Sequence, residues 1–412
     1  MSLLGRLNLR SFLGGAGWLA FAQAFTMACG LAATAVWARF MPVEVFGEFR
    51  VLIAFTSLAA AFCLVGTGQA AMMSAAKNID GNLAPLLRSR ILANVVASLG
   101  LLAAAFYYAL APAGSWPIAA GLVAAAVLFP IYNISDIWFS WVNGKSWFRE
   151  LAIERTIAGA AGVIAIVIAT LCGVTQLWIV AVLYLGLAAL VNLGVLRRIF
   201  AGQSNGDTDD SIVKYGHHSS VAMGLSGLLA VDVIILNHVY TPQAVAIYVI
   251  ALQFPNQLKA GFSVFGQALA PAIYGTDNTR AAWRAMRHRF WLLTLGAVFV
   301  GIIGYLLLPF LVTLLFGERY GEAAEYGRWL WLTTAVFGST SYLGQALLVT
   351  KHPAYLYIPN IGYPLVLLTL YIVLVPYGVS GLILARIVAV IAMAAYFVIG
   401  FLYSLQHAPQ AA

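Results

Sequence analysis

Charge is scarce in this 412-residue chain: 9% of the residues are Asp, Glu, Lys or Arg, whereas 62% are hydrophobic. A soluble protein needs far more polar surface to face water. The shortage of charge therefore argues against a soluble globular protein and predicts that lipid surrounds most of the molecule. A nucleic-acid-binding protein is also disfavoured, because the net charge of +8 comes from bases in short separate segments that form no continuous groove.

Metal-ligand and catalytic patterns are equally sparse. The six histidines have no cysteine partner and no H-E-x-x-H spacing. A Gly-Lys-Ser run at 144–146 resembles the end of a P-loop, but Phe139 stands where that loop needs its first glycine. Three cysteines fall inside apolar runs without paired or ligand spacing: Cys29, Cys63 and Cys172. The sequence therefore predicts no metal, no cofactor and no enzyme.

Long apolar runs are what the chain has in abundance. Each is close to the roughly twenty residues that an α-helix needs to cross a bilayer. Most of the 22 lysines and arginines lie in every second connection between these runs, so the positive-inside rule places both termini in the cytoplasm. We predict about twelve membrane spans, near residues 14–37, 51–72, 91–110, 117–141, 156–173, 176–196, 217–238, 243–274, 290–316, 329–350, 355–375 and 379–403.

The most polar connection, residues 201–215, has the Gly, Ser, Asn and Asp content of a flexible cytoplasmic linker. It divides the chain into six-span domains at 1–200 and 216–412. A turn with Pro42 after the first span is echoed by a turn with Pro242 after the seventh, although chance is the alternative explanation. We therefore expect an all-α, polytopic membrane protein with two six-helix bundles around a central cavity, both termini cytoplasmic.

Four short motifs stand in order along the chain, at 41–49, at 224–227 followed by Asp232, at 315–324 and at 377–381. They look like a G-P-x-x-F-G-x-[FY] turn, a run of small residues before an aspartate, L-F-G-x-x-Y-x-x-A-A, and [FY]-G-x-x-G. Met41 replaces the first glycine of the first motif. Together these motifs resemble those of the Wzx-type polysaccharide flippases, within the multidrug/oligosaccharidyl-lipid/polysaccharide exporter superfamily.

The resemblance implies a transporter that flips undecaprenyl-diphosphate-linked oligosaccharide from the cytoplasmic to the periplasmic leaflet of the bacterial inner membrane, by alternating access. The implied product is a surface polysaccharide such as O-antigen, capsule or exopolysaccharide. The implied partners, besides membrane lipids, are a polymerase and a chain-length regulator of the same pathway. Because a diphosphate must cross about 30 Å of hydrocarbon, we expect a polar, cationic interior.

Charged residues inside spans are the candidate site residues, since an ionised side chain facing lipid costs about 2.5–3.5 kcal/mol on the mildest scale. Lys259 shares a broad helix face with the amides of Gln253, Asn256 and Gln257. We interpret this face as the lining of a substrate-binding cavity. The alternative is that Lys259 pairs with a carboxylate and locks two helices together.

Arg386 and Asp232 lie at similar depths in the twelfth and seventh spans, where they can meet. In the functional interpretation Arg386 contacts the diphosphate, because a guanidinium fork suits phosphate oxygens, and Asp232 holds it or titrates during transport. A structural ion pair is the alternative. Asp136 is an ion-coupling site or an interfacial carboxylate near Lys145.

Arg39 and Arg50 break the charge rule, because they flank the first outward turn together with Glu44 and Glu48. They form the outer mouth that receives an arriving diphosphate, or they pair locally with the glutamates. The competing functions are a multidrug/cation antiporter of the same superfamily, a membrane enzyme of polysaccharide assembly, and a non-transporting scaffold. The basic residues inside the spans favour an anionic cargo over a cationic drug.

Overall fold

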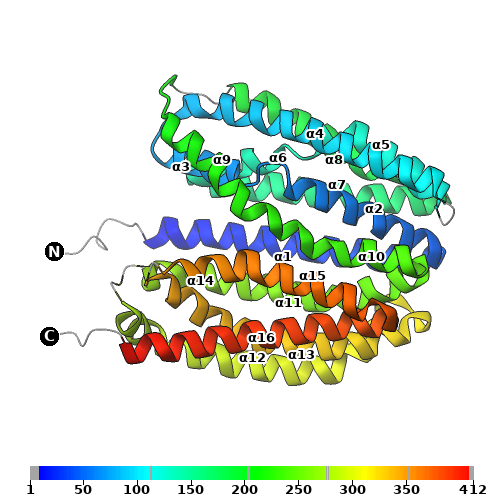
Figure 1. The fold of residues 1–412 in the computed structure, drawn as a ribbon. Helices are drawn as coiled ribbons and strands as arrows, with labels where there is room; N and C mark the ends of the chain where they lie inside the picture. The colour runs from blue at the N-terminus through cyan, green and yellow to red at the C-terminus, as the bar shows by residue number, and fades with distance from the viewer. Residues whose placement is uncertain are drawn as a thin grey trace. The chain divides into compact units, whose positions relative to one another are not determined.

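The computed structural model describes residues 9–111, 114–201, 205–274, 276, 278–350 and 352–407. Within these ranges the chain is almost entirely helical and has no strand (Figure 1). Every predicted span coincides with helical structure. The predicted all-α fold is therefore confirmed. The chain forms two compact units, Met1–Val231 and Asp232–Ala412.

The first unit is built from helices that pack side by side, with α1 against α7, and α5 between α4 and α8. Two of its predicted spans are broken helices, one at α2 and α3 and the other at α5 and α6. Its elements are α1 (Leu9–Phe40), α2 (Val43–Ala61), α3 (Gly66–Ala76), η2 (Asp80–Asn82), α4 (Leu83–Leu110), α5 (Trp116–Tyr132), α6 (Ser135–Gly144), α7 (Phe148–Leu171), α8 (Leu177–Ala201), α9 (Asp210–Gly224) and η3 (Leu225–Ala230).

The second unit begins within the short helix α10, and α13 packs against α11, α12 and α16. Its span at 355–375 is interrupted by a single π-helical turn, η5, directly before α15. The elements of this unit are α10 (Val231–Val239), α11 (Pro242–Tyr274), α12 (Thr279–Phe316), η4 (Glu318–Tyr320), α13 (Gly321–Leu348), α14 (Pro353–Tyr357), η5 (Ile358–Gly362), α15 (Tyr363–Leu374), η6 (Val375–Tyr377) and α16 (Gly378–His407).

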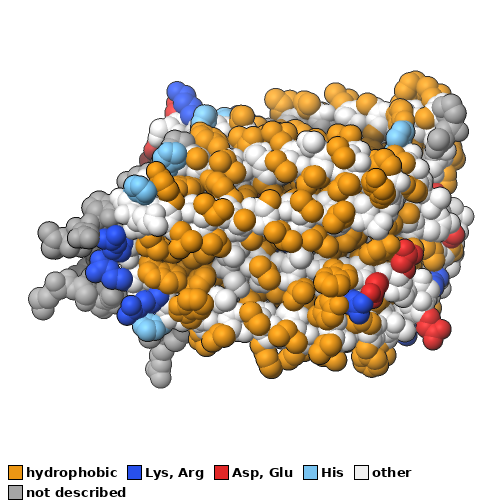
Figure 2. Space-filling view, turned by 60° about the horizontal axis from the view of Figure 1, so that its bottom comes forward, with side chains coloured by type: hydrophobic (Ala, Val, Ile, Leu, Met, Phe, Trp, Pro, Cys, Tyr) orange, Lys and Arg blue, Asp and Glu red, His pale blue; other side chains and the backbone are white. Residues whose placement is uncertain are grey.

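Seven helical segments in the described ranges are long and apolar enough to cross a membrane: Phe21–Phe40, Asp80–Leu110, Trp116–Gly144, Phe148–Leu171, Leu177–Gly194, Met286–Phe316 and Ile358–His407. The bent pair α2 and α3 adds an eighth, and the 50-residue segment Ile358–His407 is long enough for two crossings. Figure 2 shows hydrophobic side chains covering the length of the helices, with charged side chains toward their ends. The protein is a multi-pass membrane protein, and twelve crossings stay a prediction.

Two of the sequence motifs form tight connections between helices of the second unit. Gly317 ends α12 with a φ of 96°, which glycine adopts without strain, and Tyr320 after it is fully buried. Gly378 begins α16 with a φ of 67°. A Cβ at Gly381 would lie 2.0 Å from the carbonyl oxygen of Leu374, so only glycine fits there. These motifs are explained by backbone geometry and packing.

The described part of the predicted linker is hydrogen-bonded to the first unit, and its flexibility stays a prediction. The backbone N–H of Asp209 donates to Asn82 Oδ1 at 2.8 Å, and the Asn205 amide donates to the Asn78 carbonyl at 2.7 Å. Residues 202–204 lie outside the described residues. Since α9 packs on α3 and η3 packs on α2, the boundary between the compact units follows Val231 instead of falling at 201–215.

Candidate functional site

Asp232 and Arg386 form a buried ion pair in the second unit. Arg386 Nη2 lies 2.5 Å from Asp232 Oδ2, and Arg386 Nε donates to the same oxygen at 3.2 Å. Asp232 lies in the first turn of α10, and its Oδ1 accepts the backbone N–H of Val233 at 2.8 Å. The two residues predicted to be able to meet therefore do meet.

Two tyrosines complete the surroundings of this pair. Tyr248 of α11 donates its hydroxyl to Asp232 Oδ2 at 2.5 Å and accepts Arg386 Nε at 2.7 Å. Tyr371 of α15 donates to the same Asp232 oxygen at 3.4 Å. Several donors therefore converge on one carboxylate oxygen, which can accept more than one hydrogen bond. The arrangement fixes the guanidinium in position.

Burial differs across the cluster. Asp232 is only 1% exposed and both tyrosines are fully buried, whereas the Arg386 side chain is 21% exposed. The carboxylate and tyrosines thus contact one side of the guanidinium, and another part of the guanidinium reaches an open surface. Arg386 is consequently the member of the cluster that a ligand can touch.

A small polar cavity lies at that open surface. Its volume is about 60 Å³, and Arg386 lines it together with Lys259 and Asn256 of α11, Thr333 and Thr334 of α13, and Tyr363 of α15. Water occupies about 30 Å³ in the liquid, so the cavity holds a small group such as a single oxyanion. Among its described lining residues there are two cations and no carboxylate. The cavity is therefore suited to an anion.

The predicted amide face of α11 divides in two. Asn256 and Lys259 line the cavity together with Leu252 and Pro255, at the spacing of one helical face. Gln253 and Gln257 are half-buried and are not among the lining residues. Successive helical residues turn by about 100°, so these two glutamines lie on the flank of the helix beside the lining arc. Their predicted role in substrate binding stays a prediction.

Arg50 turns into the first unit, although it was predicted to lie at an outer mouth or to pair with a glutamate. Its Nη2 donates to Thr34 Oγ1 at 2.7 Å, and its guanidinium lies 5.1 Å from the centre of the Phe46 ring. Arg39 is exposed at the end of α1. Glu48 accepts the Ser115 hydroxyl at 3.0 Å. Arg50 therefore contacts Thr34 and Phe46, and its predicted contact with a diphosphate stays a prediction.

Asp136 has a different neighbour from the one predicted. Its Oδ2 lies 3.8 Å from Nη2 of Arg90, a buried residue of α4. Lys145, the expected neighbour, pairs instead with the fully buried Asp80 at 2.7 Å. Proximity in the sequence favoured Lys145, whereas the folded chain brings the Arg90 side chain to Asp136.

Three residues of these polar clusters were missed in the sequence. Tyr248 and Tyr371 stand in apolar runs, where a tyrosine looks like any other core or interfacial aromatic. Arg90 was counted among the cytoplasmic bases that set the topology, yet it is only 2% exposed. Its position directly before the predicted span at 91–110 was the sequence signal that could have identified it.

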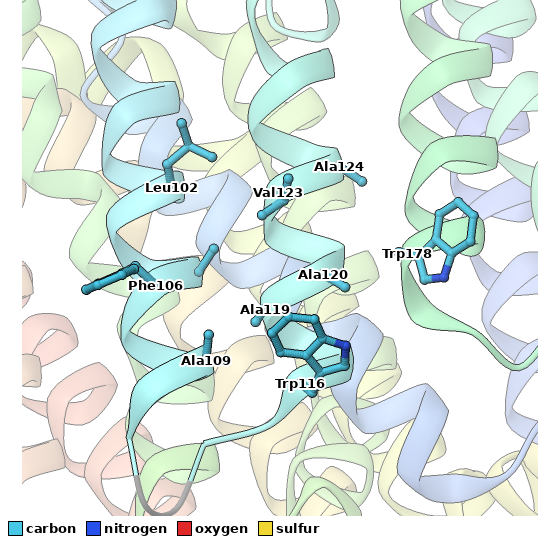
Figure 3. A pocket seen from close by; sticks show the side chains of 10 residues that line it. Leu102, Phe106, Ala109, Trp116, Ala119, Ala120, Val123, Ala124 and Trp178 are labelled. Carbon is cyan, nitrogen blue, oxygen red and sulfur yellow. The ribbon is translucent and has the colours of Figure 1, made fainter.

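A second cavity is of the opposite character. It has a volume of about 700 Å³ and lies among α4, α5 and α8, where only apolar side chains line it (Figure 3). Trp116 and Trp178 stand near the ends of their helices at its edge. Because no lining residue is charged, this cavity does not provide a site for an anionic head group. Within the described ranges, no cluster of three or more His, Cys, Asp or Glu side chains could hold a metal ion.

Sequence comparison identifies no matching protein-family model and no matching curated protein. Solved structures do match over nearly the whole chain. A multidrug resistance MATE family transporter of the MOP superfamily, in its inward-facing conformation, superposes with a TM-score of 0.73 and 13% sequence identity over 96% of this chain and 100% of that one.

Two further matches carry other descriptions. The lipid II flippase MurJ, in an inward closed conformation, gives a TM-score of 0.69 at 16% identity over 94% of this chain and 90% of that one. A MOP superfamily transporter from Pyrococcus furiosus Vc1 with a binding pocket of reverse polarity gives 0.68 at 13% identity, over 95% of both chains. At these identities the likeness shows the fold alone. The chain is therefore an all-α, multi-pass membrane protein with the fold of the MOP superfamily transporters.

Proposed function

We propose that the protein flips an undecaprenyl-diphosphate-linked oligosaccharide from the cytoplasmic to the periplasmic leaflet of the bacterial inner membrane, for surface polysaccharide biosynthesis. The observation that carries this proposal is the cavity lined by Lys259 and Arg386. Asp232, the carboxylate that pairs with Arg386, is 1% exposed and is not among the described lining residues of the cavity. The site therefore presents net positive charge to a ligand.

The two cations have complementary uses in binding a diphosphate. Arg386 has a planar fork that matches two phosphate oxygens, and Asp232 and Tyr248 hold that fork in one orientation before a ligand arrives. Lys259 supplies a mobile point charge from the facing helix. Fixing the fork in advance reduces the ordering that binding must impose. Asn256 and the two threonines of the cavity supply neutral hydrogen-bonding groups for sugar or phosphate oxygens.

The solved structures include both a lipid II flippase and multidrug transporters. The lipid cargo of the first and the four sequence motifs favour a lipid-linked substrate here. A cationic drug would meet two like charges in the cavity, which disfavours a multidrug/cation antiporter. In the proposed reaction no covalent bond changes, so the protein is a transporter and not an enzyme. A polymerase and a chain-length regulator would take up the flipped units.

The test is export of surface polysaccharide by a strain whose own flippase gene is replaced by variants of this chain. We expect Lys259→Gln and Arg386→Gln each to lower export about tenfold or more, because each removes a charged contact of about 1.5–3 kcal/mol. Lipid-linked oligosaccharide should accumulate on the cytoplasmic leaflet. Arg284→Gln is the matched control, because Arg284 is exposed on α12 and does not line the cavity.

Protein level in the membrane is measured for every variant, so that loss of export is separated from loss of protein. Unchanged export by the double variant Lys259→Gln/Arg386→Gln at normal protein level would contradict the proposal and favour a scaffold. Loss of drug resistance without any change in export would instead favour the antiporter.

A further inference from the structure

Arg90 is a buried cation whose hydrogen-bonding capacity is poorly used. Its side chain is 3% exposed, yet Nη1 has no hydrogen-bond partner among the described residues. Nε donates to the carbonyl oxygen of Asn133 at a long 3.4 Å. Arg386, by contrast, is held by short bonds to Asp232 and Tyr248. A guanidinium carries five N–H donors, and leaving buried donors unpaired is costly.

The helix break beside Arg90 is stabilised by other residues. Between the end of α5 at Tyr132 and the start of α6 at Ser135, asparagine side chains donate to backbone carbonyl oxygens. Asn94 donates to the carbonyl oxygen of Pro130 at 3.2 Å, and Asn192 donates to that of Tyr132 at 2.6 Å. Asn133 donates its side-chain amide to Asn94 Oδ1 at 3.1 Å. The break is thus held by asparagine amides, and Arg90 adds one long bond to the Asn133 carbonyl.

Asp136 separates Arg90 from the surface. Its side chain is 53% exposed, and its Oδ2 lies 3.8 Å from Arg90 Nη2, beyond hydrogen-bond distance. Arg155 of α7 is the second cation that interacts electrostatically with this carboxylate. On the side of α3, a Cβ on Gly68 would lie 3.2 Å from Asp136 Oδ2. The cluster therefore contains two arginines and one half-exposed carboxylate. The carboxylate lies near Arg90 without a hydrogen bond to it.

We propose that Arg90 is a second oxyanion-binding side chain, which takes a phosphate group of the cargo in exchange for the carboxylate of Asp136. The inference rests on the proposed function for the identity of the cargo. A phosphate carries the same sign of charge as the carboxylate and offers more acceptor oxygens to the unused donors of Arg90. Moving the Asp136 carboxylate away from Arg90 costs little free energy. Its side chain is already 53% exposed, and it makes no hydrogen bond to Arg90.

The test is binding of inorganic pyrophosphate to the full chain in lipid nanodiscs, measured by calorimetry. Lys259→Gln/Arg386→Gln is the background, so that the cavity of the second unit does not contribute. In this background, Asp136→Asn should tighten binding about tenfold, because it removes the competing charge while keeping the shape of the side chain. Arg90→Gln should abolish this binding, and Arg149→Gln, at an exposed arginine of α7, should leave it unchanged.

A purely structural ion pair predicts a different outcome. If Arg90 serves only to neutralise Asp136, then Asp136→Asn will not tighten pyrophosphate binding, and that result would overturn the proposal. Should Arg90→Gln fail to fold, Arg90→Lys keeps the charge but loses the planar fork. Its affinity should then fall, and an affinity equal to that of the background protein would also overturn the proposal. Pyrophosphate binding is measured independently of polysaccharide export. A negative binding result for Arg90 would therefore leave the proposed transport function untouched.

Discussion

At the scale of single residues, the position of Asp232 decides what Arg386 can do. The carboxylate accepts bonds from the guanidinium and from two tyrosines, and it is 1% exposed. A buried ion pair of this kind contributes little net stability when intact, because desolvation offsets attraction. Removing one partner, however, leaves an uncompensated charge. The pair therefore acts mainly to orient Arg386.

Asp232→Asn should lower the free energy of unfolding by about 3–5 kcal/mol, because the charge of Arg386 is left without its partner. The double variant Asp232→Asn/Arg386→Gln should recover most of this loss, since it removes both charges. Thermal unfolding of the purified protein in detergent measures the effect.

Glu325→Gln is the control for this prediction, because Glu325 pairs with Arg328 at an exposed site and has a side chain 56% exposed. Its effect should stay below about 1 kcal/mol. Equal stability of the Asp232→Asn protein and the unchanged protein would show that the guanidinium needs no carboxylate.

At the scale of elements, the connection between α8 and α9 departs most from its composition. Glycine, asparagine and aspartate indicate a flexible linker when only the sequence is considered. The same side chains are also good hydrogen-bonding partners, and η2 offers them complementary groups. Asp209 caps α9, and bonds from the hydroxyl and backbone N–H of Ser211 lower the pKa of Asp209 below its ordinary value. This cap therefore stays charged well below neutral pH.

Asn82→Ala should release this connection. Asn82 is fully buried, accepts the backbone N–H of Asp209 and donates to the carbonyl oxygen of Asp209 at 3.1 Å. Hydrogen exchange should show residues 205–211 protected in the unchanged protein, with protection lost by about tenfold or more in the variant, since each bond contributes about 1 kcal/mol. Asn143→Ala, at a half-buried asparagine, should leave the exchange as it is. Fast exchange of this segment in the unchanged protein would restore the flexible-linker interpretation.

At the scale of the whole molecule, the distribution of bases predicts which ends of the helices face the periplasm. The C-terminal end of α7 is predicted to face the periplasm. Cys172, an exposed free cysteine, directly follows it. Cys63 is buried and serves as an internal reference. The native cysteines thus provide a reporter of orientation.

Cys172 should react with a membrane-impermeant maleimide added outside intact spheroplasts, because the predicted topology places it at the periplasmic surface. Cys172→Ser should lose most of the labelling, and Cys63→Ser should keep it. The measurement is a mass shift of the purified protein. Labelling that requires permeabilised membranes would reverse the predicted orientation.

Much of the fold and part of the site could be predicted from sequence. Span positions followed from the roughly twenty-residue length that hydrocarbon imposes. The charges Lys259, Asp232 and Arg386 were identifiable because charge is costly in lipid. The tyrosines around Asp232 could not be predicted, since a tyrosine in an apolar run carries no mark of its partner. The helical periodicity of α11 also could not show which of its polar residues line the cavity, because that depends on where the neighbouring helices pack.

Composition predicts that lipid surrounds the protein, that helices cross the lipid, and that charged side chains lie inside the spans. These are consequences of composition and local periodicity, which act along the chain. Three contacts are seen only in the tertiary structure. Asp232 pairs with Arg386, the buried Arg90 lies beside Asp136, and the connection between α8 and α9 is hydrogen-bonded to Asn82. Each of those contacts joins residues far apart in sequence. Such contacts are set by how helices pack, which local patterns do not encode.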